Sequence, residues 1–490
     1  MTNHVPNTSR RNAKYFYRYC CAGILTLVSS LSFFYVWRVI FVPTHNITGS
    51  LLGWGNLGMA YGIYVVLYLL FGNWLKAFRI GVDRKSNIFA SQALTVFVTD
   101  LVEIFVSCAV TGQFRFFPIF LRLYAALFIG QAIVNCLLSI PMVDIYRKVF
   151  PPLQIIEVYG DARRNDLDVR MNALKYKYDV KERISIDEGE DVIREKIKGY
   201  DAVLLNDIHA HKRNRLVKMC FETNKRVYYL PKISDVLIRN SEELNLIDAP
   251  LFMNRNNGLG IRQRVFKRTF DIVASLCGII VFSPFMLITA LAIFLEDHGP
   301  VLFKQERVTY GGKRFMILKF RSMIVDAEKD GRPHPAGEND DRITKVGRVI
   351  RAIRFDELPQ LFNILAGDMS VVGPRPERWE HVEKYSEEIP EFVLRNKVKG
   401  GLTGYAQVYG KYNTSALDKL KLDLLYITNY SFKLDIEIIF ETIKILFDRG
   451  STEGFTQEAG QKLHDAELAG QSSISMSGRK VDKMVKNQIV

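Results

Sequence analysis

The segment IVASLCGIIVFSPFMLITALAIFL, Ile272–Leu295, decides how this chain folds. It is apolar throughout and exceeds the roughly 20 residues that a helix needs to cross a bilayer. Ser283 and Pro284 interrupt its centre, and a proline inside a helix removes a backbone hydrogen bond and kinks the helix. If the segment crosses a membrane, everything after it lies on the far side. If it turns back at the Ser-Pro pair, the rest of the chain stays on the near side, and periodicity alone leaves both alternatives open.

Further apolar runs precede this segment, and each is long enough for a membrane-spanning helix. Lys and Arg gather before the first run, between the second and third, and after the fourth, whereas Pro43–Ser50 has none and the third connection has only Arg115. This positive-inside pattern predicts a four-helix transmembrane unit, residues 1–150, with both ends in the cytoplasm. The alternative of four buried helices in a soluble domain does not explain the alternation of charge. The four runs cover about 20–42, 52–75, 89–112 and 116–140.

The bulk composition limits the partners and the compartment. The 490 residues are enough for two or three domains. The net charge of +14 indicates phosphate-bearing or lipid partners, and the apolar first third favours these over nucleic acid. The six cysteines form no CxxC pair, so we expect reduced structural thiols, with neither a disulfide framework nor a zinc site. The first apolar run is too long for a cleavable signal peptide.

Residues 151–253 alternate strand-like and helix-like stretches. PLQIIEVYG, YDAVLLND and RVYYLP are typical of strands, and HKRNRLVKMCFETN is typical of a helix. The alternation predicts a small Rossmann-like parallel α/β domain. Its first strand exits through a single glycine, Gly160, where a dinucleotide fingerprint needs three. A structural, dimerising or sensing role is therefore favoured over a nicotinamide site, and residues 254–264 are expected to be a linker.

Residues 265–449 form a basic, mixed α/β stretch that suits a phosphorylated ligand. Two strand-like runs surround a Tyr-Gly-Gly turn and predict a hairpin. The second run places Lys319 and Arg321 on one side of a strand, two residues apart. They are candidate phosphate contacts, with solvated cations on an edge strand as the alternative. A helix-like stretch follows a polar loop and carries Arg342, Lys345, Arg348 and Arg351, which face either solvent or lipid headgroups.

An acidic pair stands out in the segment RFDELPQLFNIL, residues 354–365. Asp356 and Glu357 precede an apolar run of helical spacing, and Pro359 fits the first turn of a helix. The pair is thus predicted at a helix N-terminus. Capping, with a stabilisation of about 1 kcal/mol, is the simpler interpretation of this stretch alone.

The next segment, GDMSVVGPRPE, favours a catalytic role for the acidic pair over capping. It predicts a tight turn, a short strand and a rigid Pro-Arg-Pro, in which proline on both sides restricts the backbone around Arg375. An arginine held in this way suits bidentate binding of a phosphate. An acidic pair, a rigid arginine and several cations together indicate phosphoryl transfer with a divalent metal.

Several motifs together resemble the bacterial sugar transferase family, the monotopic polyprenyl-phosphate phosphoglycosyl transferases. The resemblance covers about 265–449, and the upstream unit resembles the long-form members that initiate capsule, exopolysaccharide or O-antigen repeat units. Arg354-Phe355 departs from the small hydroxyl residue before Leu or Phe found in many relatives, without consequence for the acidic pair. The motifs are KRTFDIVAS, the Ser-Pro in an apolar hairpin, GPVLFKQERV, KFRSM, DELPQLFNIL, GDMSVVGPRP and GLTGYAQVYGKY.

The resemblance implies a two-step transfer from a UDP-sugar to a polyprenyl phosphate, normally undecaprenyl phosphate, with release of UMP. Asp356 is the expected nucleophile, and Glu357 is its partner, with both carboxylates as candidate ligands of Mg²⁺. Arg375 is expected to bind phosphate, with Lys319 and Arg321 as further contacts. A carboxylate nucleophile divides one displacement into two, and a helix N-terminus would favour the incoming phosphate.

The resemblance also chooses between the two paths of the fifth apolar run. UDP-sugars are cytoplasmic, so the catalytic domain is expected on the cytoplasmic face of the bacterial inner membrane. The run, about 269–297, is then a re-entrant helix that breaks at Ser283-Pro284.

Two alternatives stay open, a non-enzymatic membrane scaffold or chain-length sensor and a membrane dehydrogenase. The sequence leaves the sugar, the carrier length and the oligomeric state open, a homodimer included, and predicts a disordered tail at 450–490.

Overall fold

The computed structural model describes residues 7–41, 54–112, 114–160, 167–246, 249–254, 258–325, 341–410 and 414–447. Its chain divides into two compact units, Met1–Lys232 and Ile233–Val490. The predicted tail at 450–490 and most of the polar loop before Arg342 lie outside the described residues.

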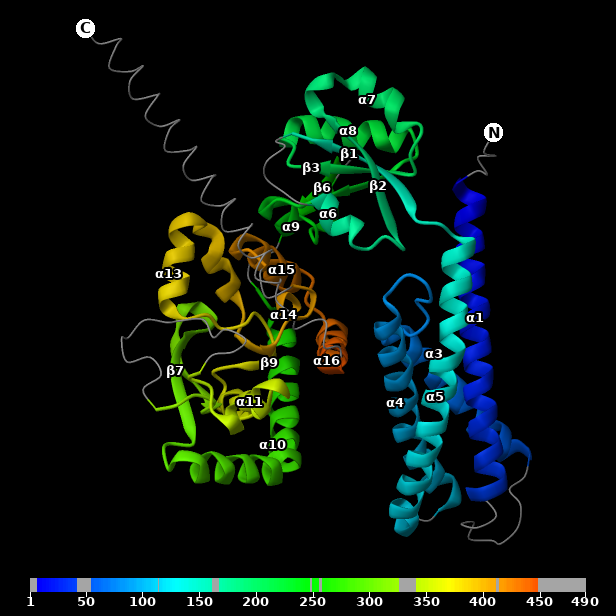
Figure 1. Ribbon diagram of the computed structural model, residues 1–490, viewed down its shortest axis with the longest axis vertical. Coiled ribbons are helices and arrows are strands. Elements are labelled where there is room, and N and C mark those ends of the chain that lie inside the picture. Colours follow the sequence, from blue (N-terminus) through cyan, green and yellow to red (C-terminus); the bar gives the residue numbers. More distant parts are fainter. Residues whose placement is uncertain are drawn as a thin grey trace. The chain divides into compact units, whose positions relative to one another are not determined.

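The first unit begins with long apolar helices (Figure 1). Phe33 and Tyr64 stack at a centroid distance of 4.3 Å in its interior, while outward side chains such as Val66 and Leu137 are more than 60 % exposed. An apolar exterior around a packed interior is the pattern expected of helices in lipid. By length and composition, these four helices and one in the second unit are able to span a membrane. The long apolar helices of the first unit are α1 (Asn7–Val36, continued by a π-turn at Trp37–Phe41), α3 (Trp54–Trp74), α4 (Lys85–Thr111) and α5 (Phe117–Val149).

A four-stranded parallel sheet in the order β2-β1-β3-β4 follows. Helices α7 and α8 pack on the sheet face formed by Ile156, Val158, Val203 and Leu205, and α6 packs on the opposite face. The three predicted strands are confirmed as β1, β3 and β4, and β2 is an additional edge strand. The elements are β1 (Leu153–Tyr159), α6 (Leu167–Asn172), β2 (Tyr178–Ser185), α7 (Glu190–Ile197), β3 (Ala202–Asn206), α8 (Ala210–Glu222) and β4 (Arg226–Tyr229).

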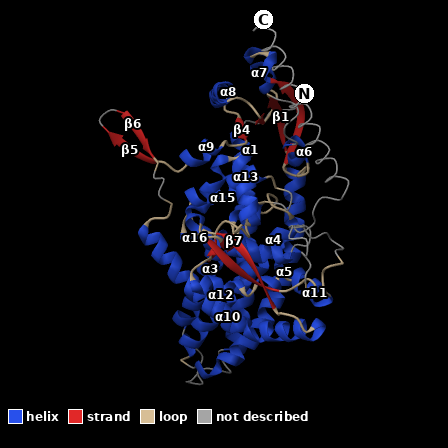
Figure 2. Cartoon of the chain, turned by 90° about the vertical axis from the view of Figure 1, so that its left-hand side faces the viewer, coloured by secondary structure: helices blue, strands red, loops and turns tan. Residues whose placement is uncertain are grey.

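The boundary between the units precedes the one expected from sequence at residue 253. Val236 of α9 (Ile233–Ile238) is buried in the core of the second unit, and Asn240 donates a hydrogen bond to the carbonyl of Thr428. These contacts explain why this segment joins the second unit. An antiparallel hairpin, β5 (Glu242–Leu246) and β6 (Ala249–Met253), follows and is seen apart from the helices in Figure 2.

The fifth apolar run forms α10, Ile261–Asp297, which begins inside the predicted linker. A straight helix of this length would extend about 55 Å, but Figure 1 shows two arms that meet at a bend. Both arms pack on the same unit, because Gly278 lies against Leu361 and Ile293 packs with Phe320 and Ile350. Pro284 lies within the helix, and Ser283 donates a hydrogen bond to the carbonyl of Ile280, which provides the local cause of a kink.

The rest of the second unit packs on one side of α10. A β7–β8 hairpin closes through a Tyr-Gly-Gly turn in which Gly311 and Gly312 have positive φ, which confirms the predicted hairpin. The elements are β7 (Leu302–Val308), β8 (Arg314–Phe320), α11 (Lys345–Ala352), α12 (Gln360–Ala366), β9 (Ser370–Val372), α13 (Trp379–Glu388), a 3₁₀ segment at Pro390–Lys397, β10 (Gly401–Thr403), α14 (Tyr405–Tyr409), α15 (Ala416–Thr428) and α16 (Phe432–Phe447).

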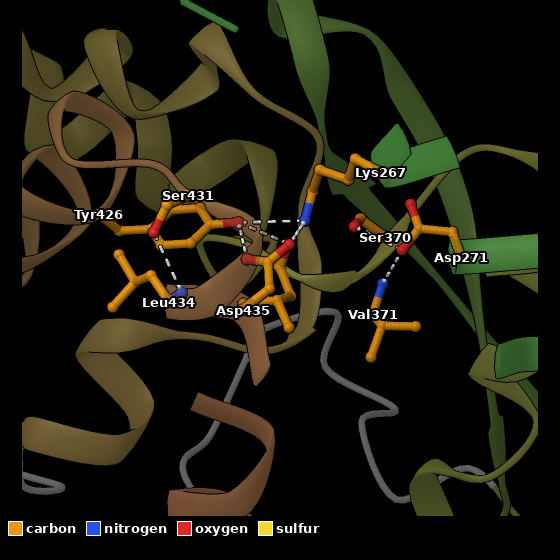
Figure 3. A network of polar contacts seen from close by, with 9 residues as sticks. Lys267, Asp271, Ser370, Val371, Tyr426, Ser431, Leu434 and Asp435 are labelled. Atoms are coloured by element: carbon orange, nitrogen blue, oxygen red, sulfur yellow. Dashed lines mark hydrogen bonds and ion pairs between the residues drawn. The ribbon is translucent and has the colours of Figure 1, made fainter. Parts of the chain in front are cut away.

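A buried polar network fastens α10 to this body (Figure 3). Lys267 Nζ lies 2.7 Å from Asp435 Oδ2 on α16 and 3.1 Å from Tyr426 Oη on α15. One turn further along α10, Asp271 Oδ1 accepts hydrogen bonds from the Ser370 hydroxyl and the Val371 amide, both at 2.9 Å. The contacts fix the rotation and the depth of the first arm.

We expect Lys267→Met to lower the free energy of unfolding by about 3–5 kcal/mol, because removal of one partner leaves a buried charge unpaired. The second variant, Lys267→Met with Asp435→Leu, should recover most of this loss. The measurement is denaturant unfolding of the detergent-solubilised full chain.

The matched control is Lys433→Met, since Lys433 forms an exposed pair with Glu437 on the same helix as Asp435 and exposed pairs contribute little. Equal losses for Lys267→Met and Lys433→Met would contradict the structural role of the network.

Candidate active site

The acidic pair lies on a single 3₁₀ turn, Phe355–Glu357, directly before α12. Arg354 enters this turn with φ 60° and ψ 20°, a left-handed conformation that is uncommon for a residue other than glycine. Pro359 precedes the first residue of α12 with helical dihedrals, and its position has no side-chain capping bond. The predicted place just before a helix is confirmed, whereas the capping interpretation is wrong for the structure described here.

Glu357 is held by two cations instead of backbone amides. Its Oε1 accepts hydrogen bonds from Lys319 Nζ at 3.1 Å and Arg375 Nη2 at 2.6 Å. Only 9 % of the residue is exposed. Burial alone would raise the pKa of this carboxyl, but Arg375 and Lys319 outweigh it and hold the pKa well below its usual value. Glu357 is therefore a fixed anion that links three segments of the chain.

Asp356 differs from its neighbour in its surroundings. Its Oδ1 is buried and has no hydrogen-bond partner among the described residues. Burial raises the pKa of this carboxyl, the charge of Glu357 raises it further, and the nearby cation of Lys319 opposes both. A carboxylate that is desolvated and not hydrogen-bonded is the more basic and more nucleophilic member of such a pair.

Arg375 projects from a loop that is held at several points. Its carbonyl accepts a 2.9 Å hydrogen bond from Arg395, whose guanidinium is in turn paired with buried Asp423 at 2.7 Å. Its Nη1 lies 3.4 Å from Gln407 Oε1. A Cβ at Gly373 would lie 2.4 Å from the Lys399 carbonyl, so this glycine permits the close approach of the two backbones. The rigid presentation expected of Pro-Arg-Pro thus depends on tertiary contacts as well as on proline.

The structure separates the two cations that the sequence placed together. Lys319, near the end of β8, reaches Glu357. Arg321 follows the last residue of the strand, is 7 % exposed, and pairs with Asp297 at the end of α10. Of the sequence-predicted residues, Asp356, Glu357, Lys319 and Arg375 come together, while Arg321 lies in a different set of contacts. Ser283 and Pro284 lie in α10, outside this cluster.

The cluster also contains residues that the sequence did not single out. Arg395 and Gln407 contact Arg375, and Arg307 donates a 3.1 Å hydrogen bond to the carbonyl of Pro376. Arg307 lies in the motif GPVLFKQERV, but the sequence does not show which face of a hairpin a charged side chain occupies until the pairing register is known.

The arrangement fits a hard divalent cation held by few protein ligands. The described residues contain no group of three or more His, Cys, Asp or Glu side chains able to hold a metal by themselves. Mg²⁺, however, is commonly bound by one or two carboxylates together with substrate phosphates and water. The unpartnered Oδ1 of Asp356 meets that requirement, and Glu357 adds a second carboxylate beside it.

Comparison with known proteins gives this cluster a context. The bacterial sugar transferase family matches residues 262–449. A UDP-N-acetylgalactosamine-undecaprenyl-phosphate N-acetylgalactosaminephosphotransferase of Aeromonas hydrophila is 39% identical over 261 residues, 50% of this chain and 59% of the relative. A UDP-glucose:undecaprenyl-phosphate glucose-1-phosphate transferase of Klebsiella pneumoniae is 41% identical over 266 residues, 52% of this chain and 56% of the relative.

The chain thus spans little more than half the length of these two curated relatives. A third relative, the exopolysaccharide production protein PSS of Rhizobium leguminosarum bv. phaseoli, is 40% identical over 194 residues. That alignment covers 38% of this chain but 97% of the relative. Because this relative is covered almost completely and the family match includes the acidic pair, the chain belongs to the bacterial sugar transferase family.

Proposed function

We propose that the protein transfers a sugar 1-phosphate from a UDP-sugar to a polyprenyl phosphate, probed best with undecaprenyl phosphate, in the first step of exopolysaccharide, capsule or O-antigen assembly. The observation that carries the proposal is the buried, unpartnered Oδ1 of Asp356 beside a glutamate held by Lys319 and Arg375. The names of the relatives describe this class of reaction. Those names carry different sugars at similar identity, so the identity of the sugar is not part of the proposal.

In the first step, an oxygen of Asp356 attacks the β-phosphorus of the UDP-sugar. A new O–P bond forms, the bridging P–O bond breaks, and UMP leaves with the bonding electron pair. Arg375 and Lys319 neutralise charge on the phosphoryl oxygens in a site that is already formed before substrate arrives. The 2.6 Å contact of Arg375 with Glu357 sets the direction of the guanidinium.

In the second step, a phosphate oxygen of the polyprenyl carrier attacks the phosphorus of the aspartyl intermediate. The Asp356–P bond breaks, the carboxylate is restored, and the product is a polyprenyl-diphosphate-sugar. The same cations serve both steps, because the transferred phosphoryl group occupies the same place in each. A covalent carboxylate route divides one difficult displacement into two easier ones.

Asp356 and Glu357 would hold Mg²⁺, which when bound would withdraw charge from the phosphate oxygens. The protein groups have separate tasks beside it. Glu357 keeps Arg375 and Lys319 in place, and Arg395 supports the loop from behind.

The geometry of α10 supports a re-entrant path with the catalytic domain on the cytoplasmic face of the inner membrane. Both arms carry strongly exposed apolar side chains, such as Val281 at 61 %, Leu287 at 71 % and Ile288 at 65 %, and both return to the same unit. Surfaces of this kind are stable in lipid. With Ser283-Pro284 as the break, the acidic pair would lie near the headgroups, where the carrier presents its phosphate.

The scaffold alternative required the acidic pair to do no more than cap a helix. Neither carboxylate makes a capping bond to α12, so that alternative loses its main support. No contact in the described part of the Rossmann-like domain favours a dehydrogenase, and a Cβ at Gly160 would lie 2.4 Å from the Asp207 carbonyl. This glycine serves backbone packing.

We expect Asp356→Asn to abolish UMP release from UDP-sugar, because an amide does not form the covalent intermediate. Wild type incubated with UDP-sugar and Mg²⁺ without acceptor should gain the mass of one sugar phosphate, and the variant should not. Intact-protein mass spectrometry makes the measurement.

Glu306→Gln is the matched control for this experiment, since Glu306 lies exposed on β7 and pairs with Arg314. The control should retain wild-type turnover. Full turnover by Asp356→Asn would remove Asp356 as nucleophile, and no UMP from wild type with any common UDP-sugar would overturn the proposed reaction.

The rate of the first step should fall as the pH drops through the pKa of Asp356, because only the ionised carboxylate attacks. Glu357 raises this pKa and Lys319 lowers it. Glu357→Gln should therefore move the acid limb of the profile to lower pH, and Lys319→Met should move it to higher pH. Single-turnover UMP release measured from about pH 4 to pH 8 tests both shifts; shifts in one common direction would refute the assignment.

The proposed topology predicts which side of the membrane each residue faces. In a chain whose native cysteines are replaced, a cysteine at Lys433, which is 62 % exposed, should react with an impermeant maleimide only from the cytoplasmic side. A cysteine at Arg115, in the third connection, should react only from outside. Labelling of both positions from the same side would show that α10 spans the bilayer or that the four-helix topology is different.

A further inference from the structure

Arg307 on β7 is a partly buried cation that the proposed mechanism does not use. Its Nη1 donates to the Pro376 carbonyl at 3.1 Å, and its Nη2 donates to Gln305 Oε1 at 2.6 Å. Both acceptors are neutral. Among the described residues, no carboxylate forms an ion pair with Arg307, and its Nε is buried without a hydrogen-bond partner.

Cations and carboxylates both act on Arg307. Burial and the neighbouring charge of Arg375 lower the pKa of Arg307 to about 10, although Glu377 and Glu357 act in the opposite sense. The group is still a cation at neutral pH. A second unsatisfied donor lies next to Arg375, because the amide Nε2 of Gln407 is also buried without a partner. A guanidinium with a buried, unbonded Nε and an unfilled amide donor together describe a place for an anion.

The hairpin register shows where this place lies relative to the acidic pair. Phe303 is opposite Lys319 and Arg307 is opposite Phe315 in the β7–β8 ladder. Opposite residues of an antiparallel pair share a face, and so do residues two or four apart on one strand. Arg307 and Lys319 are therefore on the same face, separated along the hairpin by about 13 Å of backbone. Arg375 reaches Glu357, while the carbonyl of the next residue, Pro376, receives Arg307.

We propose that Arg307 binds the phosphate of UMP, the phosphate that stays with the nucleoside when the sugar phosphate is transferred. This inference rests on the proposed function and assigns the second half of the diphosphate. Lys319 and Arg375 serve the β-phosphoryl group beside Asp356, and Arg307 serves the α-phosphate further along the same face. When the bridging P–O bond breaks, the electron pair remains on UMP, and the unpaired cation of Arg307 neutralises that charge.

The test compares UMP with uridine, which lacks the phosphate, by calorimetric titration of the full-length protein in detergent. Arg307→Gln should weaken UMP binding by about ten-fold or more, because a hydrogen bond to a charged group is lost. It should leave uridine binding unchanged. Arg307→Lys keeps the positive charge but lacks the guanidinium group. Its affinity for UMP should therefore lie between that of wild type and that of Arg307→Gln. Lys304→Gln, which removes a cation from an exposed position of the same strand that faces the other way, should bind UMP as wild type does.

Unchanged UMP affinity in both Arg307 variants would overturn the inference, as would an equal loss of uridine binding, which marks a structural defect. If Arg307→Gln does not fold, an Arg307→Lys chain with wild-type UMP affinity would overturn it as well. Because calorimetry needs no turnover, the two proposals fail separately. If sugar-phosphate transfer is normal and the variants bind UMP as wild type does, only the role of Arg307 is refuted. If UMP binding depends on Arg307 but the chain shows no transfer activity, only the proposed reaction is refuted.

Discussion

The rest of the catalytic unit depends on the ion pairs of Glu357. One carboxylate oxygen joins β8 through Lys319, the Pro-Arg-Pro loop through Arg375, and the 3₁₀ turn on which it lies. A buried carboxylate needs such partners, because the loss of one leaves an uncompensated charge in a desolvated place. Lys319 and Arg375 depend on Glu357 in the same way, because this protein anion balances their charge. Among the described residues, no carboxylate pairs with Arg307 in the way that Glu357 pairs with Lys319 and Arg375.

A second constraint determines where that cluster lies. The first arm of α10 is fastened by Lys267 and Asp271 to α15, α16 and β9, and the second arm ends against α11, where Glu296 accepts the Lys345 amide at 2.7 Å. Between these fastened ends the helix exposes apolar side chains on both arms. The polar anchors lie at the ends and the apolar surface lies between them, so the contacts that hold the bend also fix where this apolar surface lies on the domain.

The sequence predicted the features that rest on local chemistry. The glycine turn of the β7–β8 hairpin, the place of the acidic pair before a helix and the strand before Pro-Arg-Pro all follow from nearest neighbours. Strand β2 was missed because YDVKERIS is a half-exposed edge strand with little apolar alternation. The capping interpretation failed because Lys319 and Arg375, far away in sequence, compete for Glu357. The contacts of Arg321 and Arg307 could not be predicted from the sequence. Arg321 turns toward Asp297, and the strand register decides which face of the hairpin carries Arg307.

The two adjacent carboxylates are chemically alike, and only their surroundings separate them. Glu357 receives two charge-assisted hydrogen bonds that draw down its basicity, and motion toward a phosphorus atom would break both. Asp356 receives none in the described part of the chain, and burial makes its charge costly until that charge is shared with an electrophile. Attack by Asp356 would therefore relieve a desolvated charge, whereas attack by Glu357 would leave the cations of Lys319 and Arg375 without their anion. This asymmetry is the physical reason to assign Asp356 as the nucleophile and Glu357 as the residue that holds its cations in place.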